Sequence, residues 1–478
     1  MTSENREKRI LLRSGKSPFD VVPLEQAMQD NVFATNTGNL IFSEASHKIL
    51  EAPRTEIVSG GARTADPAAA SRINAEYDAY VVPLANAFRP SFEGQLKRLT
   101  QLIRRLDIPV VVLGVGAQTG LSYDPSRLKA MEPTVKAFVS AVLDRSATIG
   151  VRGEFTESYL NDLGFRDVEV IGCPSMFMNG GTFRVDKRAE GLTADSRIAV
   201  NGSHSAVRSG VGAIVSRTHR LYPNLQFIGQ NLVEAQQLHW RDLSDPVTAP
   251  LTTIPTHPAH PMFGEDKVRV YVDPQTWIGA LRDMDFSFGS RIHGNIAALL
   301  AGTPAMVLCH DSRTLELCRY FGIPHRKLTE TPKDVDPADL YEQADFSELV
   351  DGHRERFDRF TGFLDKNGLQ NTFTHGDGGA AFDARLAKQS FPAGVRPWND
   401  TGIDELAGRL AWLQGRVQEL SSENTKLRTE LGRSVRARTA RTAAAVPQQR
   451  RTGGSLPVTV YRTARRAVGP IKRALRPE

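Results

Sequence analysis

The sequence predicts an α/β fold made of two parallel-sheet domains in tandem. Short apolar segments alternate with amphipathic ones along most of the chain, which is typical of alternating strands and helices. The apolar segments are nearly continuous, as expected for parallel strands covered on both faces. A polar, glycine-rich stretch at about 181–195 divides this pattern into two sets. Two separate sheets are therefore expected.

The first set spans residues 1–185. Strands are expected at 32–36, 55–60, 78–86, 108–116, 146–153 and 168–174. Helices are expected at 40–50, 92–106, 128–144 and 155–164. The last of these ends at Gly164, a typical C-cap residue.

The second set spans residues 186–369. Strands are expected at 197–201, 225–230, 268–273, 285–290 and 303–309. Helices are expected at 275–284, 294–302 and 312–322. Residues 234–264 are rich in proline and histidine and show no periodicity, which predicts a long, functional loop.

The C-terminal region contains a heptad repeat. Residues 370–402 are expected to be a flexible linker, and 403–432 a coiled coil. Its a positions are Ile403, Leu410, Val417, Asn424 and Leu431, and its d positions are Leu406, Leu413, Leu420 and Leu427. A single Asn at an a position fixes register, so this helix predicts a homodimer. The alternative is an amphipathic helix packed on the body of the same chain.

Positive charge is concentrated at the C-terminus. The formal net charge is +6, but residues 433–478 hold eleven Arg and one Lys against one acid. The rest of the chain is mildly acidic. This basic tail is expected to be either disordered or in contact with an anionic membrane surface.

Several classes of protein are disfavoured by the composition. The sequence shows no secretory signal and no membrane-spanning run, so a cytoplasmic location is expected. Three cysteines without paired spacing argue against a disulfide framework or a zinc site. Without a Walker A sequence, a GxSxG elbow or an HExxH pair, we expect neither metal nor cofactor.

Polar side chains and glycines follow several of the predicted strands. They are Asn36, Gly38, Asn39, Gly114, Gly116, Arg152, Asn201, Ser290, Arg291, Ile292 and His293. Ligands of parallel sheets bind at the carboxyl ends of the strands. Two arginines and a histidine at this edge suit a compact polyanion. A structural interpretation also stands, in which Arg291 pairs with a carboxylate and His293 caps a helix.

Five blocks of sequence resemble the polysaccharide pyruvyl transferase family. They are NTGNLIF, VVVLGVGAQ, IGVRGEFTESYL, VIGCPSMF and FGSRIHGNIAALLAGTPAMVLCHDSRTLEL, within residues 30–330. The last block is the most specific. The resemblance implies two Rossmann-like domains facing across a cleft, similar to GT-B glycosyltransferases. The first domain is then the acceptor side and the second the donor side.

The resemblance also implies an activity, the transfer of the enolpyruvyl group of phosphoenolpyruvate to a sugar as a ketal. It places the arginine and histidine of the family's C-terminal motif on Arg291 and His293. Arg291 and Arg152 suit the two anionic ends of the donor, and the Ile292 N–H suits a donor contact. His293 is the candidate acid and base, because imidazole titrates near neutrality.

Other positions match the family less clearly. Members often have Asp where this chain has Asn39, so this chain departs from the family pattern at a position where an acid role would need a carboxyl group. Arg313 follows the family pattern and is a candidate ligand contact, but it has Asp311 and Glu316 as alternative ion-pair partners.

Three functions are therefore compared. The first is a pyruvyl transferase acting on a glycan or lipid-linked precursor of a cell-surface or capsular polysaccharide. The second is a GT-B-type glycosyltransferase using a nucleotide sugar, although the expected E-x7-E signature is missing. The third is a non-catalytic scaffold assembled by the coiled coil. Nucleic-acid binding is not expected, since the body has no second basic surface.

Overall fold

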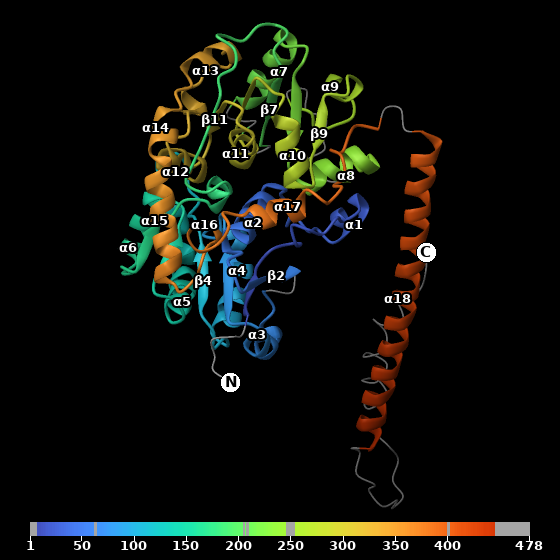
Figure 1. The fold of residues 1–478 in the computed structure, drawn as a ribbon. Coiled ribbons are helices and arrows are strands. Elements are labelled where there is room, and N and C mark those ends of the chain that lie inside the picture. Colours follow the sequence, from blue (N-terminus) through green and yellow to red (C-terminus); the bar gives the residue numbers. More distant parts are fainter. Residues whose placement is uncertain are drawn as a thin grey trace, which may run out of the picture. The chain divides into compact units, whose positions relative to one another are not determined.

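The structure is a computed structural model that describes residues 7–61, 65–203, 206, 210–244, 254–398 and 402–444. The chain divides into two compact units, Met1–Asp400 and Thr401–Glu478. The first unit, called the body below, contains both sheets (Figure 1).

The N-terminal half of the body is built on a parallel sheet in the order β2-β1-β3-β4. A bridge between Val115 and Val151 continues this sheet into the parallel pair β5 and β6. The strands are β1 (Lys8–Leu12), β2 (Thr55–Ser59), β3 (Ala79–Pro83), β4 (Val110–Leu113), β5 (Ile149–Val151) and β6 (Val168–Val170). The helices are α1 (Leu24–Gln29), α2 (Gly38–Leu50), α3 (Ala70–Glu76), α4 (Glu93–Ile103), α5 (Glu132–Leu143) and α6 (Glu154–Asp162).

The C-terminal half is built on a six-stranded parallel sheet in the order β12-β11-β10-β7-β8-β9. Its strands are β7 (Ile198–Asn201), β8 (Gln226–Gly229), β9 (Val268–Val270), β10 (Phe286–Gly289), β11 (Ala305–Cys309) and β12 (His325–Lys327). Starting from β7, the chain adds two strands on one side and three on the other. This is the strand order of dinucleotide-binding folds, and the order reverses between β7 and β10.

The helices of the C-terminal half connect these strands and then return toward the first half. They are α7 (Val211–Leu221), α8 (Leu232–Trp240), α9 (Pro261–Gly264), α10 (Pro274–Leu281), α11 (Ile292–Leu300), α12 (Ser312–Phe321), α13 (Pro337–Gln343), α14 (Ser347–Asp351) and α15 (His353–Lys366). The predicted α/β class, with two halves that are each built on a parallel sheet, is confirmed.

Helix α2 lies at the junction of the two halves. It contacts β2 and β3 of the first half and α10 and α11 of the second. As a result, twelve of its thirteen residues are buried, including Glu44, His47 and Lys48. Burial raises the pKa of Glu44 to about 7, and Gln275 of α10 donates a hydrogen bond of 2.7 Å to Glu44 Oε1. The junction is therefore a packed interface that includes polar contacts.

The structure corrects several predictions at the N-terminus and in the second half. Residues 32–36, expected as a strand, form a turn in which Ala34 and Thr35 have positive φ. Strand β1 was not predicted. The expected loop 234–264 begins within α8 and contains α9, while 245–253 lie outside the described residues.

The domain boundaries also differ from the expected ones. Helix α15, expected in the second domain, packs on the first half, where Phe360 stacks on Phe177 with ring centroids 4.9 Å apart. The expected linker 370–402 contains α16 (Thr372–His375) and α17 (Ala380–Leu386). Lys48 of α2 lies 2.8 Å from Asp383, and Val395 pairs with Val270 of β9. These contacts hold the described part of this segment, through Trp398, against the body.

The second unit contains α18 (Ile403–Ala444), one continuous helix of 42 residues. This agrees with the predicted helix at 403–432. The basic tail 433–478 falls within α18 up to Ala444, and its remainder lies outside the described residues. Within the described ranges, no helix combines the length and the apolar character needed to cross a lipid bilayer.

Candidate active site

The turn after β10 lies where the strand order of the C-terminal sheet reverses. Gly289 ends this strand with φ of +147°, and a Cβ there would lie 1.9 Å from the backbone oxygen of Asn201. Only glycine allows the ends of β7 and β10 to approach so closely. The turn then continues through Ser290 and Arg291 into α11.

A buried amide network holds this turn. Asn201 Oδ1 accepts a hydrogen bond of 2.8 Å from the Arg291 N–H, and Ser290 Oγ accepts one of 2.9 Å from the Ser203 N–H. Asn295 Nδ2 donates to the carbonyl oxygens of Gly289 and Arg291. Ser290 and Asn295 are fully buried. The network fixes the backbone direction at the start of α11, as satisfied buried polar groups do.

Arg291 is positioned by this turn. Its Nε donates to the carbonyl oxygen of Gly202 at 3.3 Å. Burial lowers the pKa of Arg291, Glu234 raises it, and Arg313 lowers it. The structural alternative, a direct ion pair with a carboxylate, is not what the described contacts show, because the guanidinium bonds a backbone carbonyl.

His293 lies in the first turn of α11, against the N-terminal half. A Cβ on Gly38 would lie 2.9 Å from His293 Nδ1, so the glycine makes room for the ring. On its other side, His293 Nε2 lies 3.6 Å from Cys173 Sγ. Burial, together with Arg152 and Arg313, lowers the pKa of His293 to about 3. In this structure the imidazole is therefore neutral at pH 7, in contrast to the near-neutral titration expected from the sequence.

Arg152 follows β5 and is 1% exposed. Its stem lies across Gly116, where a Cβ would come within 3.3 Å of Arg152 Cδ. Among the described residues, its Nε and Nη2 have no hydrogen-bond partner. A buried guanidinium that lacks such partners is costly, because it has lost its hydration. These donors are available to an anion.

Two further arginines lie close enough to Arg152 to interact with it electrostatically. Burial lowers the pKa of Arg89, and Arg313 and Arg152 lower it further. The Nε of Arg89 is buried and has no hydrogen-bond partner in the described part of the chain. Arg313 comes from α12 of the second half, and its Nε lies 2.8 Å from Asp311 Oδ2. We call Arg89, Arg152 and Arg313 the arginine cluster.

Two carboxyls border the arginine cluster. Burial alone would raise the pKa of Asp311, but Arg313, His310 and the hydrogen bonds from Thr314 together outweigh it, and the pKa is lowered. Burial raises the pKa of Glu316 to about 7, and its two oxygens accept hydrogen bonds from the N–H and Oγ1 of Thr156. One ionised carboxylate and one partly protonated carboxyl cannot neutralise three guanidiniums. The cluster therefore retains an excess of positive charge.

Helix α12 joins the two halves at this point. Ser312 Oγ accepts a hydrogen bond of 2.8 Å from the Thr119 N–H and donates one of 3.2 Å to the carbonyl oxygen of Ala117. Gln118 Nε2 donates to Asp311 Oδ2 at 3.2 Å. These bonds connect the loop after β4 to the first turn of α12, whose Arg313 interacts electrostatically with Arg152.

The N-terminal turn contributes backbone geometry. Asn36 Oδ1 accepts a hydrogen bond of 2.9 Å from the Gly38 N–H, and the Thr37 N–H donates to the carbonyl oxygen of Gln230. Asn39 points away from His293, because its Nδ2 donates to the carbonyl oxygens of Phe33 and Ala34. A carboxylate could not donate these bonds. The described contacts of Asn39 are thus those of a turn-forming amide.

Gly114 is also a structural residue. Its φ is +69°, and a Cβ there would lie 2.6 Å from the carbonyl oxygen of Gly172. The structure thus brings together Arg152, Arg291, His293, Arg313, Gly38 and Gly116, with Asn201 and Ser290 holding the turn and Ile292 in the first turn of α11. Gly114 and Asn39 shape the loops around them.

Sequence reasoning missed Arg89 and Cys173. Arg89 lies in the loop after β3, where the order of the N-terminal sheet reverses between β1 and β3. Since ligands bind at such reversals, β1, had it been predicted, could have drawn attention to this loop. Cys173 was noted only as an unpaired cysteine, and all three cysteines are buried free thiols.

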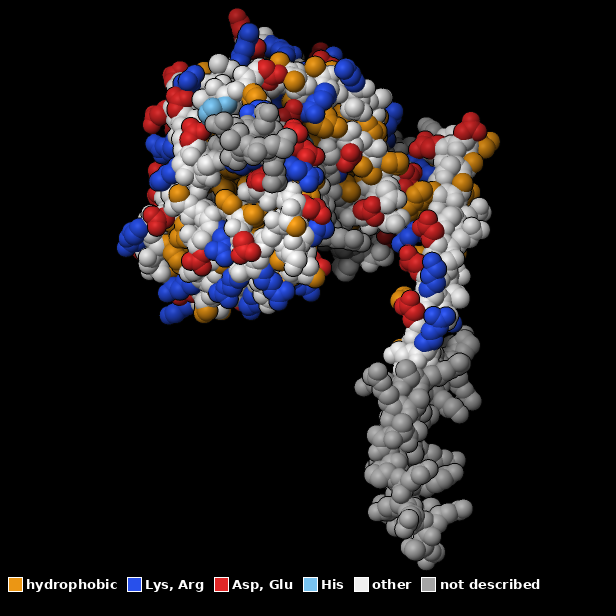
Figure 2. Space-filling view, turned by 60° about the horizontal axis from the view of Figure 1, so that its bottom comes forward, with side chains coloured by type: hydrophobic (Ala, Val, Ile, Leu, Met, Phe, Trp, Pro, Cys, Tyr) orange, Lys and Arg blue, Asp and Glu red, His pale blue; other side chains and the backbone are white. Residues whose placement is uncertain are grey.

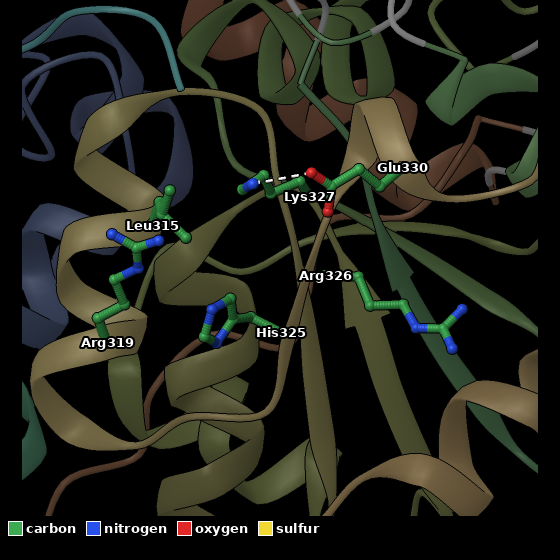
Figure 3. Close-up of a pocket in the computed structure, with 6 residues that line it drawn as sticks. All are labelled: Leu315, Arg319, His325, Arg326, Lys327 and Glu330. Carbon is green, nitrogen blue, oxygen red and sulfur yellow. Dashed lines mark hydrogen bonds and ion pairs between the residues drawn. The ribbon is translucent and has the colours of Figure 1, made fainter. Parts of the chain in front are cut away.

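A separate basic pocket lies on another part of the C-terminal half. It has a volume of about 290 Å³ and is lined by Leu315, Arg319, His325, Arg326, Lys327 and Glu330 (Figure 3). Lys327 Nζ lies 2.8 Å from Glu330 Oε1, and Arg326 donates to Gln343. None of the predicted site residues lines this pocket, and its charges are partly paired. Elsewhere, acidic and basic side chains are interspersed over the visible face of the body (Figure 2).

The described residues contain no group of three or more His, Cys, Asp or Glu side chains that could hold a metal ion. The donors at the arginine cluster are guanidinium groups. Such donors bind anions.

The chain matches the model of one protein family. The model described as "Polysaccharide pyruvyl transferase" matches residues 36–312. A search of curated proteins finds no match.

Among solved structures, the chain is similar to the UDP-GlcNAc 2-epimerase of Methanocaldococcus jannaschii in complex with UDP-GlcNAc and UDP. The identity is 10%, the TM-score is 0.42, and 75% of this chain and 99% of that one are covered. It is also similar to S. aureus MnaA with UDP, at 13% identity and a TM-score of 0.38, covering 83% of this chain and 100% of that one. The assignment of this chain to the α/β class depends on its own parallel sheets.

Proposed function

Because the chain belongs to the polysaccharide pyruvyl transferase family, we propose that it transfers the enolpyruvyl group of phosphoenolpyruvate to a sugar, forming a pyruvate ketal. The acceptor is a precursor of a cell-surface or capsular polysaccharide, free or linked to lipid. The observation that carries this proposal is the arginine cluster, with buried guanidinium N–H groups of Arg152 and Arg89 that have no hydrogen-bond partner among the described residues.

The donor has two anionic ends, and the site has two cationic regions. The arginine cluster combines side chains of both halves and suits the phosphate, which carries up to two charges. Arg291, held by the turn after β10, suits the carboxylate, and the N–H groups at the start of α11 lie beside it. Charge-assisted bonds from guanidinium groups favour such a small dianion or trianion over a neutral sugar.

Donor binding also changes the state of His293. Two of the causes that lower its pKa are the positive charges of Arg152 and Arg313. A bound phosphate neutralises these charges, so the pKa of His293 rises on binding. The imidazole can then hold a proton when the donor is present, which is the condition for a general acid.

The proposed reaction uses two hydroxyl groups of the sugar and releases inorganic phosphate. The C3 methylene of the enolpyruvyl group gains a proton and becomes a methyl group, which makes C2 electrophilic. One sugar hydroxyl oxygen forms a bond to C2, and a second replaces the phosphate oxygen as the C2–O bond to phosphate breaks. Of the two hydroxyl protons, one is accounted for on C3 and the other on the released phosphate. His293 is the proposed group that carries protons between these sites.

The experiment is titration calorimetry of the full chain with phosphoenolpyruvate and, separately, with UDP-sugars. Wild type, Arg291→Ala and the exposed control Arg98→Ala on α4 are compared. We expect phosphoenolpyruvate to bind the wild type and the control and to bind Arg291→Ala at least tenfold more weakly. Binding of UDP-sugars without phosphoenolpyruvate would contradict the proposal and favour a nucleotide-sugar glycosyltransferase.

A membrane-bound acceptor would fit the sequence of the tail. Residues 433–478 carry eleven Arg and one Lys against one acid, and such segments bind anionic lipid surfaces. We propose that the tail holds the enzyme at the cytoplasmic face of a membrane. Cosedimentation with vesicles of 30% anionic lipid tests this, with loss of binding expected on truncation after Ala444.

A further inference from the structure

Helix α18 presents an apolar stripe that is interrupted at one position, Asn424. Among its described side chains, eight apolar residues at the a and d positions are 36% to 85% exposed. They are Ile403, Leu406, Leu410, Leu413, Val417, Leu420, Leu427 and Leu431. An exposed stripe of leucines sustained over four heptads is typical of one strand of a coiled coil.

The side chains that flank the stripe identify the partner. In heptads read from Ile403, the g positions are Arg409, Arg416, Glu423 and Glu430, and Arg428 is at an e position. If a second copy pairs parallel and in register, Glu423 of one copy faces Arg428 of the other, and the pair occurs twice. No unlike partner is needed for this complementarity.

An antiparallel pair of the same helices is the competing arrangement. With full overlap, Leu410 lies opposite Leu427 of the other copy, and the g positions then match Arg409 with Glu430 and Arg416 with Glu423. The charges alone therefore favour the antiparallel pair. Arg409 and Arg416, however, already bond Glu405 and Glu419 within their own helix.

Asn424 favours the parallel arrangement. In a parallel dimer the two Asn424 amides meet at one a layer and bond each other. In the antiparallel dimer each amide is buried against Leu413 of the other copy. An amide buried without a partner costs more than an exposed ion pair gains. We propose that α18 forms a parallel, in-register homodimer in which Asn424 pairs with its own copy.

This orientation has a consequence for the basic tail. In both copies the chain continues beyond Ala444 from the same end of the coiled coil. Two tails, each with seven Arg and one Lys after Ala444, then extend from the same end of the dimer. Two such segments on one dimer raise the affinity for an anionic surface through effective concentration.

The test uses introduced cysteines in the full chain. The three native cysteines are buried, so Leu410→Cys and Leu427→Cys supply accessible thiols. In the parallel dimer each variant forms a disulfide with its own copy under mild oxidation. In the antiparallel dimer neither variant does so alone, and cross-linking requires a mixture of both. That second result would overturn the proposal, as would a wild-type mass near 52.6 kDa by light scattering.

Charge substitutions give an independent measurement. We expect Glu423→Arg to raise the dimer dissociation constant about fivefold at low salt, and Glu423→Arg with Arg428→Glu to restore it. Glu430→Arg is the matched control, because Glu430 faces Val435 in the parallel dimer. Equal effects of Glu423→Arg and Glu430→Arg would show the antiparallel pairing instead. Neither result depends on the proposed enzymatic activity.

Discussion

At the turn after β10, in the C-terminal half, the buried amides of Asn201 and Asn295 bond backbone groups and each other. In the N-terminal half, the buried guanidinium of Arg152 has two nitrogen atoms without a hydrogen-bond partner among the described residues. In the first region, the polar groups hydrogen-bond one another and hold the turn in place. In the second region, two guanidinium nitrogens are left without a described partner and can bind a ligand. A satisfied network positions a site, whereas unsatisfied buried donors indicate what the site binds.

The largest expected effect comes from replacing the donors that lack partners. Arg152→Met keeps an unbranched apolar stem and removes the guanidinium group with its charge. We expect kcat/KM for pyruvyl transfer to fall about a thousandfold, since two charge-assisted bonds are lost. The free energy of unfolding should stay equal or rise, because a buried charge is replaced by an apolar group.

Steady-state kinetics and urea unfolding of the same variant check this prediction. Arg98→Met, on the exposed face of α4, is the control and should change neither quantity. A loss of stability in Arg152→Met that matches the loss of activity would mean that Arg152 is a structural residue. Its unpartnered donors would then not indicate a ligand site.

The second largest effect is expected at the turn after β10, where the buried amide network lies. Gly289→Ala places a Cβ 1.9 Å from the Asn201 backbone oxygen at a φ of +147°. We expect the free energy of unfolding to fall by about 3 kcal/mol or more. Gly279→Ala on α10, where a Cβ would meet no atom within 4 Å, is the control and should be neutral or stabilising. Similar melting temperatures for both variants would contradict this account.

The pH dependence of stability tests the state of His293. Its pKa is about 3 in the folded protein, against 6.5 for the unperturbed side chain. Between these values the unfolded chain binds a proton that the folded protein does not, so stability falls as pH falls below about 6.5. His293→Gln lacks this contribution. Between pH 7 and 5 we expect the wild type to lose about 2 kcal/mol more than the variant.

Urea unfolding at several pH values measures this difference. His47 also has a pKa lowered to about 3 by burial, but it is present in both proteins and cancels. Equal pH slopes for wild type and His293→Gln would show that His293 has the same pKa in the folded protein as in the unfolded chain. The arginine cluster would then not control its charge.

The smallest expected effect is that of Arg89. It is half-buried, and its Nε is the one atom of its side chain that is both buried and without a described partner. We expect Arg89→Met to raise KM for phosphoenolpyruvate about tenfold with little change in kcat. Inhibition by inorganic phosphate should weaken by a similar factor, while Arg98→Met leaves both unchanged. A change in kcat alone would place Arg89 outside the phosphate region.

Much of the fold follows from local sequence pattern. Nearly continuous apolar segments predicted most of the strands, and the glycine-rich break predicted two sheets. The misses have physical reasons. Residues 32–36 are apolar enough for a strand, but Asn39 holds them in a turn through its amide. Strand β1 begins with two basic residues, so its apolar run is only three residues long, and its neighbours β2 and β3 lie about 47 and 70 residues away along the chain.

By itself, the sequence determined the class of the fold, the turn that carries Arg291 and His293, and the heptad positions of α18. These depend on residues that are close along the chain, so periodicity and turn chemistry reveal them. Only the tertiary structure decided that Arg89, Arg152 and Arg313 meet, and that His293 is neutral. Charges from both halves and burial set these properties, because electrostatic interactions depend on distance in space and on the exclusion of water.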